Sequence, residues 1–202
     1  MQNNKPLSHY LSIYENLDPQ ETARRCNIEF NSETGCFSLR ILGVEYRVPH
    51  PGFALLDPDE NETTDSYAKI LFIRYLCEGK YFPSQGKQLS YNEFPWGDVY
   101  YRNFVKRCLK PCASVFGRDI ANFVKMIERN PQLRAETREG GDAAYRLEFI
   151  SGLYITVILW RGDDEFPPSS QILFDDNFVF AFTAEDLAVA GSVLVERLKN
   201  LL

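Results

Sequence analysis

The chain has 202 residues, of which 45% are hydrophobic and 25% charged, as is typical of one soluble globular domain. Its net charge of −6 argues against nucleic acid and anionic membranes as partners, because both attract basic surfaces. No apolar run approaches the ~20 residues of a membrane span. Residues 1–6 lack the apolar core of a secretory signal. We therefore expect a single cytoplasmic domain over residues 1–202, of unknown oligomeric state.

The N-terminal part predicts two helices and a β-hairpin. Apolar residues recur at helical spacing in the first segment: Leu7, Tyr10, Leu11, Tyr14 and Leu17. Asp18-Pro19 ends this helix and begins the next, as N-cap and first-turn proline. Apolar and polar residues then alternate over 37–48 around Leu42-Gly43, which indicates antiparallel strands.

The middle of the chain, from about Ser66 to Asn130, is mostly helical. Residues 66–78 predict a strongly apolar helix closed by Gly79, and further helices are expected around 100–109 and 120–127. Residues 80–99 are rich in aromatic and turn residues. Cys108 and Cys112 continue an apolar helical stripe, which favours core packing over metal ligation. The odd total of five cysteines does not suggest a disulfide framework.

The C-terminal part predicts strands at 133–137, 144–149, 153–160 and 171–174, followed by a helix with capping-box spacing at Thr183 and Asp186. Strands and helices are segregated along the chain instead of alternating. We therefore predict an α+β fold. In it, an antiparallel-rich sheet from the N- and C-terminal parts packs against the mostly helical middle segment.

The segment 160–176 is the main candidate site, because a buried strand ends there in a concentrated polar loop. Its candidate ligand-binding residues are Trp160, Arg161, Asp163, Asp164, Glu165, Ser169, Ser170 and Asp175. We expect the acids on both sides of the second strand to converge at one end of the two strands. A divalent cation on Asp163, Asp164, Glu165 and Asp175 would then serve a hydrolase or transferase. The alternative is a solvated loop that ends the strand.

Three further features are candidates for binding. Tyr91 and Trp96 belong to an aromatic patch that would line a pocket for a flat ligand. His50 lies between two prolines after a strand, where it would suit a ligand or proton transfer. A basic face for an acidic partner is expected from Arg102, Lys106, Arg107, Lys110, Arg118, Lys125, Arg129 and Arg134. For each feature, ordinary packing or a solvated surface is the favoured interpretation.

Several segments carry a family resemblance: residues 7–10, residues 37–43, and above all Leu159 to Ser169 together with residues 172–175. These segments resemble the family called domain of unknown function 3786, and residues 183–188 fit its closing helix. The resemblance spans nearly the whole chain. It implies a protein of anaerobic bacteria or archaea, from a family without established activity in which some members are fused to iron–sulfur-binding modules.

The resemblance therefore implies a non-enzymatic module, linked to anaerobic redox or corrinoid metabolism, that binds a small molecule or an iron–sulfur or corrinoid protein. This chain lacks a cluster-type cysteine motif, so an iron–sulfur role would belong to the partner. The residues themselves contain no dinucleotide fingerprint, phosphate loop or nucleophile elbow. They indicate no particular cofactor.

Overall fold

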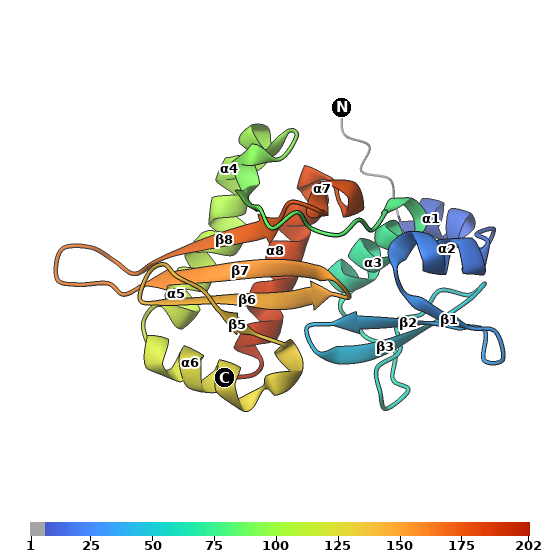
Figure 1. The fold of residues 1–202 in the computed structure, drawn as a ribbon, viewed down its shortest axis with the longest axis horizontal. Helices are drawn as coiled ribbons and strands as arrows, with labels where there is room; N and C mark the ends of the chain where they lie inside the picture. The colour runs from blue at the N-terminus through green and yellow to red at the C-terminus, as the bar shows by residue number, and fades with distance from the viewer. Residues whose placement is uncertain (1–6) are drawn as a thin grey trace.

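The computed structural model of the protein describes residues 7–202, and Figure 1 shows helices gathered around one antiparallel sheet. Its strands are β1 (Glu29–Asn31), β2 (Cys36–Ile41), β3 (Val44–Pro49), β4 (Gln88–Ser90), β5 (Glu136–Thr137), β6 (Ala143–Ile150), β7 (Leu153–Trp160) and β8 (Ser169–Asp175). The order is β1-β2-β6-β7-β8-β4, with β3 also beside β2 and β5 also beside β6. This arrangement confirms the predicted α+β class.

Four of the eight α-helices in residues 7–202 begin at a side-chain N-cap. The eight are α1 (Leu7–Tyr14), α2 (Pro19–Cys26), α3 (Ser66–Glu78), α4 (Gly97–Phe104), α5 (Lys110–Phe116), α6 (Ile120–Arg129), α7 (Phe178–Ala181) and α8 (Ala184–Lys199), and the capped ones are α2, α3, α6 and α8. Asp18 accepts backbone hydrogen bonds at the start of α2, and Thr183 and Asp186 form the expected capping box at the start of α8. A π-helical segment (Val105–Leu109) joins α4 to α5.

The central strands β6, β7 and β8 present an apolar face to the helices. Ile155, Val157 and Leu159 alternate along β7 and are fully buried on that face. Figure 1 shows α8 crossing behind these strands with α5 on the same side. Cys108 and Cys112 are also fully buried, so their predicted core packing is confirmed. None of the helices in residues 7–202 is long and apolar enough to cross a membrane.

The N-terminal hairpin joins the central strands at a narrow seam. Strand β2 pairs with β6 only through Ile41 and Ile150, and the Leu42 N–H donates to the Phe149 carbonyl at 3.0 Å. Glu148 of β6 also makes ion pairs at 2.6 Å with Arg40 and at 3.3 Å with Arg134. The seam is therefore held by few backbone bonds and a buried carboxylate.

Two of the differences from the sequence prediction concern short strands. Residues 88–90 of the aromatic stretch form the edge strand β4 beside β8. Most of the strand expected at 133–137 is absent: Pro131–Leu133 forms a 3₁₀ turn, Arg134 has a left-handed backbone with φ of 49°, and only Glu136–Thr137 pairs with β6. Such short strands depend on a tertiary partner more than on their own residue pattern.

Candidate functional site

The two acidic segments around β8 lie at opposite ends of that strand. The register pairs Trp160 with Ser169 and Ile155 with Phe174, so residues 161–168 form the loop of a β7–β8 hairpin. Asp175 ends β8 at the far side, roughly 20 Å away at about 3.3 Å per residue. The expected convergence of Asp163, Asp164 and Glu165 with Asp175 is therefore wrong. In this antiparallel hairpin the loop precedes the first residue of β8, whereas Asp175 is its last residue, so the two acidic segments are separated by the length of the strand.

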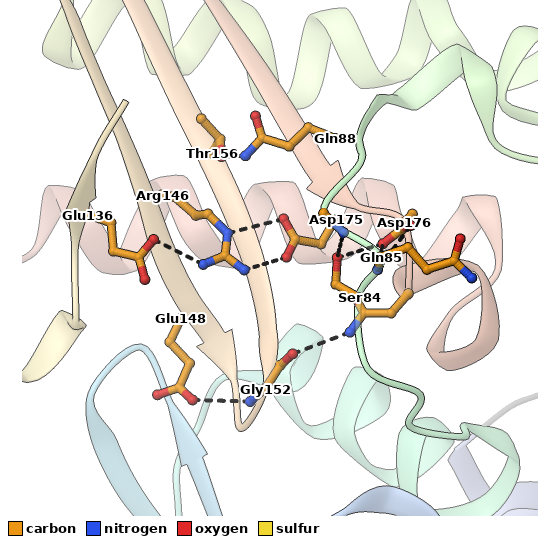
Figure 2. Close-up of polar contacts among 12 residues, drawn as sticks. Ser84, Gln85, Gln88, Glu136, Arg146, Glu148, Gly152, Thr156, Asp175 and Asp176 are labelled. Atoms are coloured by element: carbon orange, nitrogen blue, oxygen red, sulfur yellow. Dashed lines mark hydrogen bonds and ion pairs between the residues drawn. The ribbon is translucent and has the colours of Figure 1, made fainter. Parts of the chain in front are cut away.

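Asp175 is engaged in a buried ion pair with Arg146 of β6, as Figure 2 shows. Nε of Arg146 donates to Oδ1 at 3.3 Å and Nη2 donates to Oδ2 at 2.6 Å. Glu136 accepts from Nη1 at 3.1 Å, and the guanidinium lies 3.7 Å from the centre of the Tyr154 ring. Burial opposes the charge, but Asp175 and then Glu136 outweigh it and raise the pKa of Arg146. This carboxylate stabilises the sheet and is not free for a ligand.

The acidic hairpin loop is organised by its own backbone. The Asp163 side chain accepts hydrogen bonds from the N–H groups of Glu165 and Phe166 at 2.9 and 2.7 Å, forming an Asx turn. Asp164 and Glu165 are exposed, and the Arg161 N–H donates to Asp142. Across residues 7–202, no three His, Cys, Asp or Glu side chains are placed to hold a metal ion.

A groove of about 550 Å³ lies beside this loop, between α5 and the beginning of β8. We call it the hairpin groove. Its apolar wall consists of Val105, Leu109, Ala113, Pro167 and Pro168. Its polar groups come from Tyr101, Lys110, Ser114, Arg118, Ser169, Ser170 and Gln171. Two of the predicted site residues, Ser169 and Ser170, therefore line a hollow of the surface.

The hairpin groove is held in shape by contacts between its two walls. Ser170 Oγ donates to the Leu109 carbonyl at 2.8 Å, which joins β8 to the π-helical segment. A Cβ added at Gly117 would lie 2.9 Å from Pro168, so the loop packs closely against the end of α5. Single π-helical turns are frequent at functional sites. The groove thus combines preformed walls with an unusual helix geometry.

Charge in the hairpin groove is positive. Lys110 and Arg118 both line it, and neither forms an ion pair with an acid in the described part of the chain. Both belong to the predicted basic face. Other members of that face are engaged elsewhere: Arg107 lies over the Tyr67 ring at 5.5 Å, and Arg134 pairs with Glu148. The groove is therefore lined by two cations that form no ion pair within residues 7–202, next to apolar surface.

The two candidate residues of the aromatic patch differ in exposure, because Tyr91 is buried and Trp96 is exposed. Tyr91 is fully buried, its hydroxyl donates to the Ala184 carbonyl at 2.7 Å, and its ring stacks on Phe104 at 4.2 Å. Burial also raises its pKa. The expectation that Tyr91 lines a ligand pocket is therefore wrong, because its polar tip is satisfied within the core. Trp96, by contrast, is 71% exposed.

The remaining candidates lie outside the hairpin groove. Nε2 of His50 is 3.0 Å from the Tyr14 carbonyl, and its ring packs edge-on against Tyr14 and Phe37. It therefore packs against α1 and β2. Trp160 is exposed at the end of β7 but does not line the groove. The sequence analysis did not connect Val105 and Ala113 with the site. Both residues line the groove from helical segments that are distant from β8 in the chain.

The fold and its surface define an α+β protein with helices on one face of an antiparallel sheet and a cationic, apolar groove beside a hairpin. The chain belongs to the family described as Domain of unknown function (DUF3786), whose model matches residues 18–197. This match confirms the resemblance seen in the sequence, and it includes every strand of the sheet. Comparison with curated proteins and with solved structures gives no match.

Proposed function

We propose that the protein is a ligand-binding module whose site is the hairpin groove. The observation that carries this proposal is a preformed hollow with mostly apolar walls and two cations, Lys110 and Arg118, that form no ion pair in the described part of the chain. Its volume of about 550 Å³ falls in the range of small-molecule sites, about 300–1,000 Å³. The ligand that fits this chemistry is an organic molecule with an apolar body and one anionic group.

Each wall has a distinct role in this proposal. Val105, Leu109 and Ala113 remove the apolar body of the ligand from water, which favours binding in proportion to the buried area. Lys110 and Arg118 attract and neutralise the anionic group, and Arg118 can contact it through two parallel hydrogen bonds. The neighbouring hydroxyls of the groove accept or donate hydrogen bonds that orient the ligand.

The hairpin groove does not support all the partner classes implied by the family resemblance to the same extent. A small-molecule ligand is supported by the dimensions of the hairpin groove. An iron–sulfur or corrinoid protein as partner, and a link to anaerobic redox metabolism, remain predictions from the resemblance. The divalent-metal hydrolase or transferase is not proposed, because Asp175 pairs with Arg146 at the far end of β8.

Fluorescence titration with 8-anilinonaphthalene-1-sulfonate tests the proposal, since this probe has an apolar aromatic body and one sulfonate. We expect saturable binding to the native protein, displaced by decanoate. Ala113→Phe should abolish it by filling the groove. The double variant Lys110→Ala/Arg118→Ala should weaken it about tenfold or more, as expected for the loss of charge-assisted contacts.

The matched control removes the same charge from another helix. Lys125 and Arg129 are exposed on α6, outside the groove, so Lys125→Ala/Arg129→Ala should leave probe affinity within about twofold. Melting temperatures of all variants confirm that each is folded. Probe binding that survives Ala113→Phe, or that responds equally to the two charge variants, contradicts the proposal.

A further inference from the structure

A second surface, unrelated to the hairpin groove, exposes large apolar side chains around α7. Trp96 is 71% exposed and Phe180 is 51% exposed, and Phe82 and Val179 are also exposed. The rings of Phe82 and Phe180 contact each other with centres 4.6 Å apart. Figure 1 shows the segment between α3 and α4 running beside α7. We call this surface, formed by Phe82, Trp96, Val179 and Phe180, the α7 face.

The α7 face contains hollows as well as projections. One hollow of about 290 Å³ lies between Trp96, Val179 and Phe182. The other, of about 570 Å³, is lined by Phe82, Val179 and Phe180. Val179 borders both hollows, so the two are continuous parts of one surface. A surface that presents both projecting rings and hollows can complement a second copy of itself.

The backbone conformation at Trp96 indicates that the exposure of its ring serves a function. Trp96 has φ of 67°, in the left-handed region, which is unfavourable for a residue with a Cβ. The next residue, Gly97, leaves no room for a side chain, because an added Cβ would lie 2.0 Å from the Tyr91 carbonyl oxygen. The chain thus holds a large, mostly exposed ring in a strained conformation, and such outliers cluster at functional sites.

Charge along the α7 face changes sign from one end to the other. Lys80 and Lys87 lie at the Phe180 end, where the Lys80 N–H donates to the Phe180 carbonyl and Lys87 lines the larger hollow. Neither lysine forms an ion pair within residues 7–202. Asp98 and Glu185 lie at the Trp96 end, in the first turns of α4 and α8.

Two other acids, Asp176 and Glu93, lie near these ends and accept hydrogen bonds from neutral groups. Asp176 lines the larger hollow beside Lys87, but its carboxylate accepts hydrogen bonds from Ser84 Oγ and the Gln85 N–H. Glu93, near Trp96, accepts from both the N–H and the hydroxyl of Ser90. Hydrogen bonds from neutral groups leave both carboxylates charged, so Lys80 and Lys87 outweigh Asp176 at one end of the face. Asp98, Glu185 and Glu93 make the other end acidic.

We infer that the α7 face binds a second copy of this chain about a twofold axis near Val179. A twofold rotation reverses the direction of the face, so the basic end of one copy meets the acidic end of the other. Lys87 then opposes Asp98 of the partner subunit, twice per dimer. Trp96 enters the larger hollow beside Phe180 of the partner subunit, where a buried tryptophan contributes strongly to association.

Sedimentation velocity of the full-length protein over a concentration series tests this inference. We expect a monomer–dimer equilibrium. Trp96→Gly should weaken dimerisation at least about tenfold, as for loss of a central aromatic contact, while glycine relieves the left-handed backbone and preserves the fold. Phe166→Ser removes an equally exposed aromatic ring from the hairpin loop and should leave the equilibrium unchanged. A protein that stays monomeric at every attainable concentration overturns the inference.

A charge-swap experiment distinguishes a second copy from any other partner. Lys87→Glu alone and Asp98→Lys alone should each weaken self-association, because like charges then meet at both contacts. An equimolar mixture of the two variants should associate as the wild type does, since opposite charges then face each other at both contacts of the heterodimer. Self-association unaffected by either variant, or a mixture that fails to associate, excludes this arrangement.

Discussion

Replacing Asp175 with alanine should destabilise the protein strongly without affecting probe binding at the hairpin groove. The Asp175 side chain is 3% exposed and accepts two hydrogen bonds from Arg146. Removing one partner of a buried ion pair typically costs about 3–5 kcal/mol. Arg146 is 17% exposed and keeps Glu136 at 3.1 Å, so the remaining charge is partly compensated. We therefore expect a loss of about 2–3 kcal/mol in the free energy of unfolding.

Urea unfolding followed by circular dichroism measures this loss, and a thermal scan provides an independent check. For a chain of 202 residues, about 2–3 kcal/mol corresponds to a melting temperature lower by roughly 5–10 °C. The double variant Arg146→Met/Asp175→Leu should recover part of the stability, because neither charge is then left buried. The coupling between the two sites follows from the double-mutant cycle.

The matched control is Asp164→Ala, which removes an exposed carboxylate from the hairpin loop. It should change the free energy of unfolding by less than about 0.5 kcal/mol, as for most exposed positions. If Asp175→Ala costs no more than this control, the ion pair does not stabilise the sheet and the structural role assigned to Asp175 is refuted.

Three further predictions concern two glycines and the cysteines. Gly191→Ala in α8 should cost about 1–3 kcal/mol, because the new methyl group would lie 2.8 Å from the Cys108 sulfur; urea unfolding measures it. Gly141→Ala should be at least as harmful, since φ is 60° and the Cβ would lie 2.3 Å from a β7 carbonyl oxygen; a melting temperature near wild type would contradict this. Burial raises the pKa of Cys108 to about 11 and of Cys112 to about 12, from about 9. Iodoacetamide at pH 8 should therefore label the partly exposed Cys36 first, and unfolding stability should fall as pH rises above 9, because the unfolded thiols ionise before the folded ones.

Much of the fold was predictable because its signals are local. The Asp18 N-cap, the alternation over 37–48 and the Thr183–Asp186 capping box each involve residues close in the chain, and all three appear as expected. The long strand at 153–160 was equally clear from its unbroken apolar run. Such patterns report directly on the period of a helix or strand.

The candidate site was less predictable because it depends on contacts between distant segments. The hairpin groove arises where α5 meets the start of β8, about 60 residues later in the chain, as in the Ser170–Leu109 hydrogen bond. The burial of Tyr91 depends on Phe104 and Ala184, and nothing in the pattern around Tyr91 shows which side it faces. The ion pair of Asp175 with Arg146 follows from strand order, which short-range patterns do not determine.

The narrow seam between the N-terminal hairpin and β6 has a mechanical consequence. With a single residue pair joining β2 to β6, the sheet transmits little force across that line. Helix α3, which contacts α1, α2 and α8, connects the N-terminal helices to the C-terminal half. The hairpin itself reaches the C-terminal half through side chains, in the Arg40–Glu148 ion pair and in the hydrogen bond from Arg197 of α8 to the Tyr46 hydroxyl. Native-state hydrogen exchange should therefore show the two sides of the seam opening as separate cooperative units.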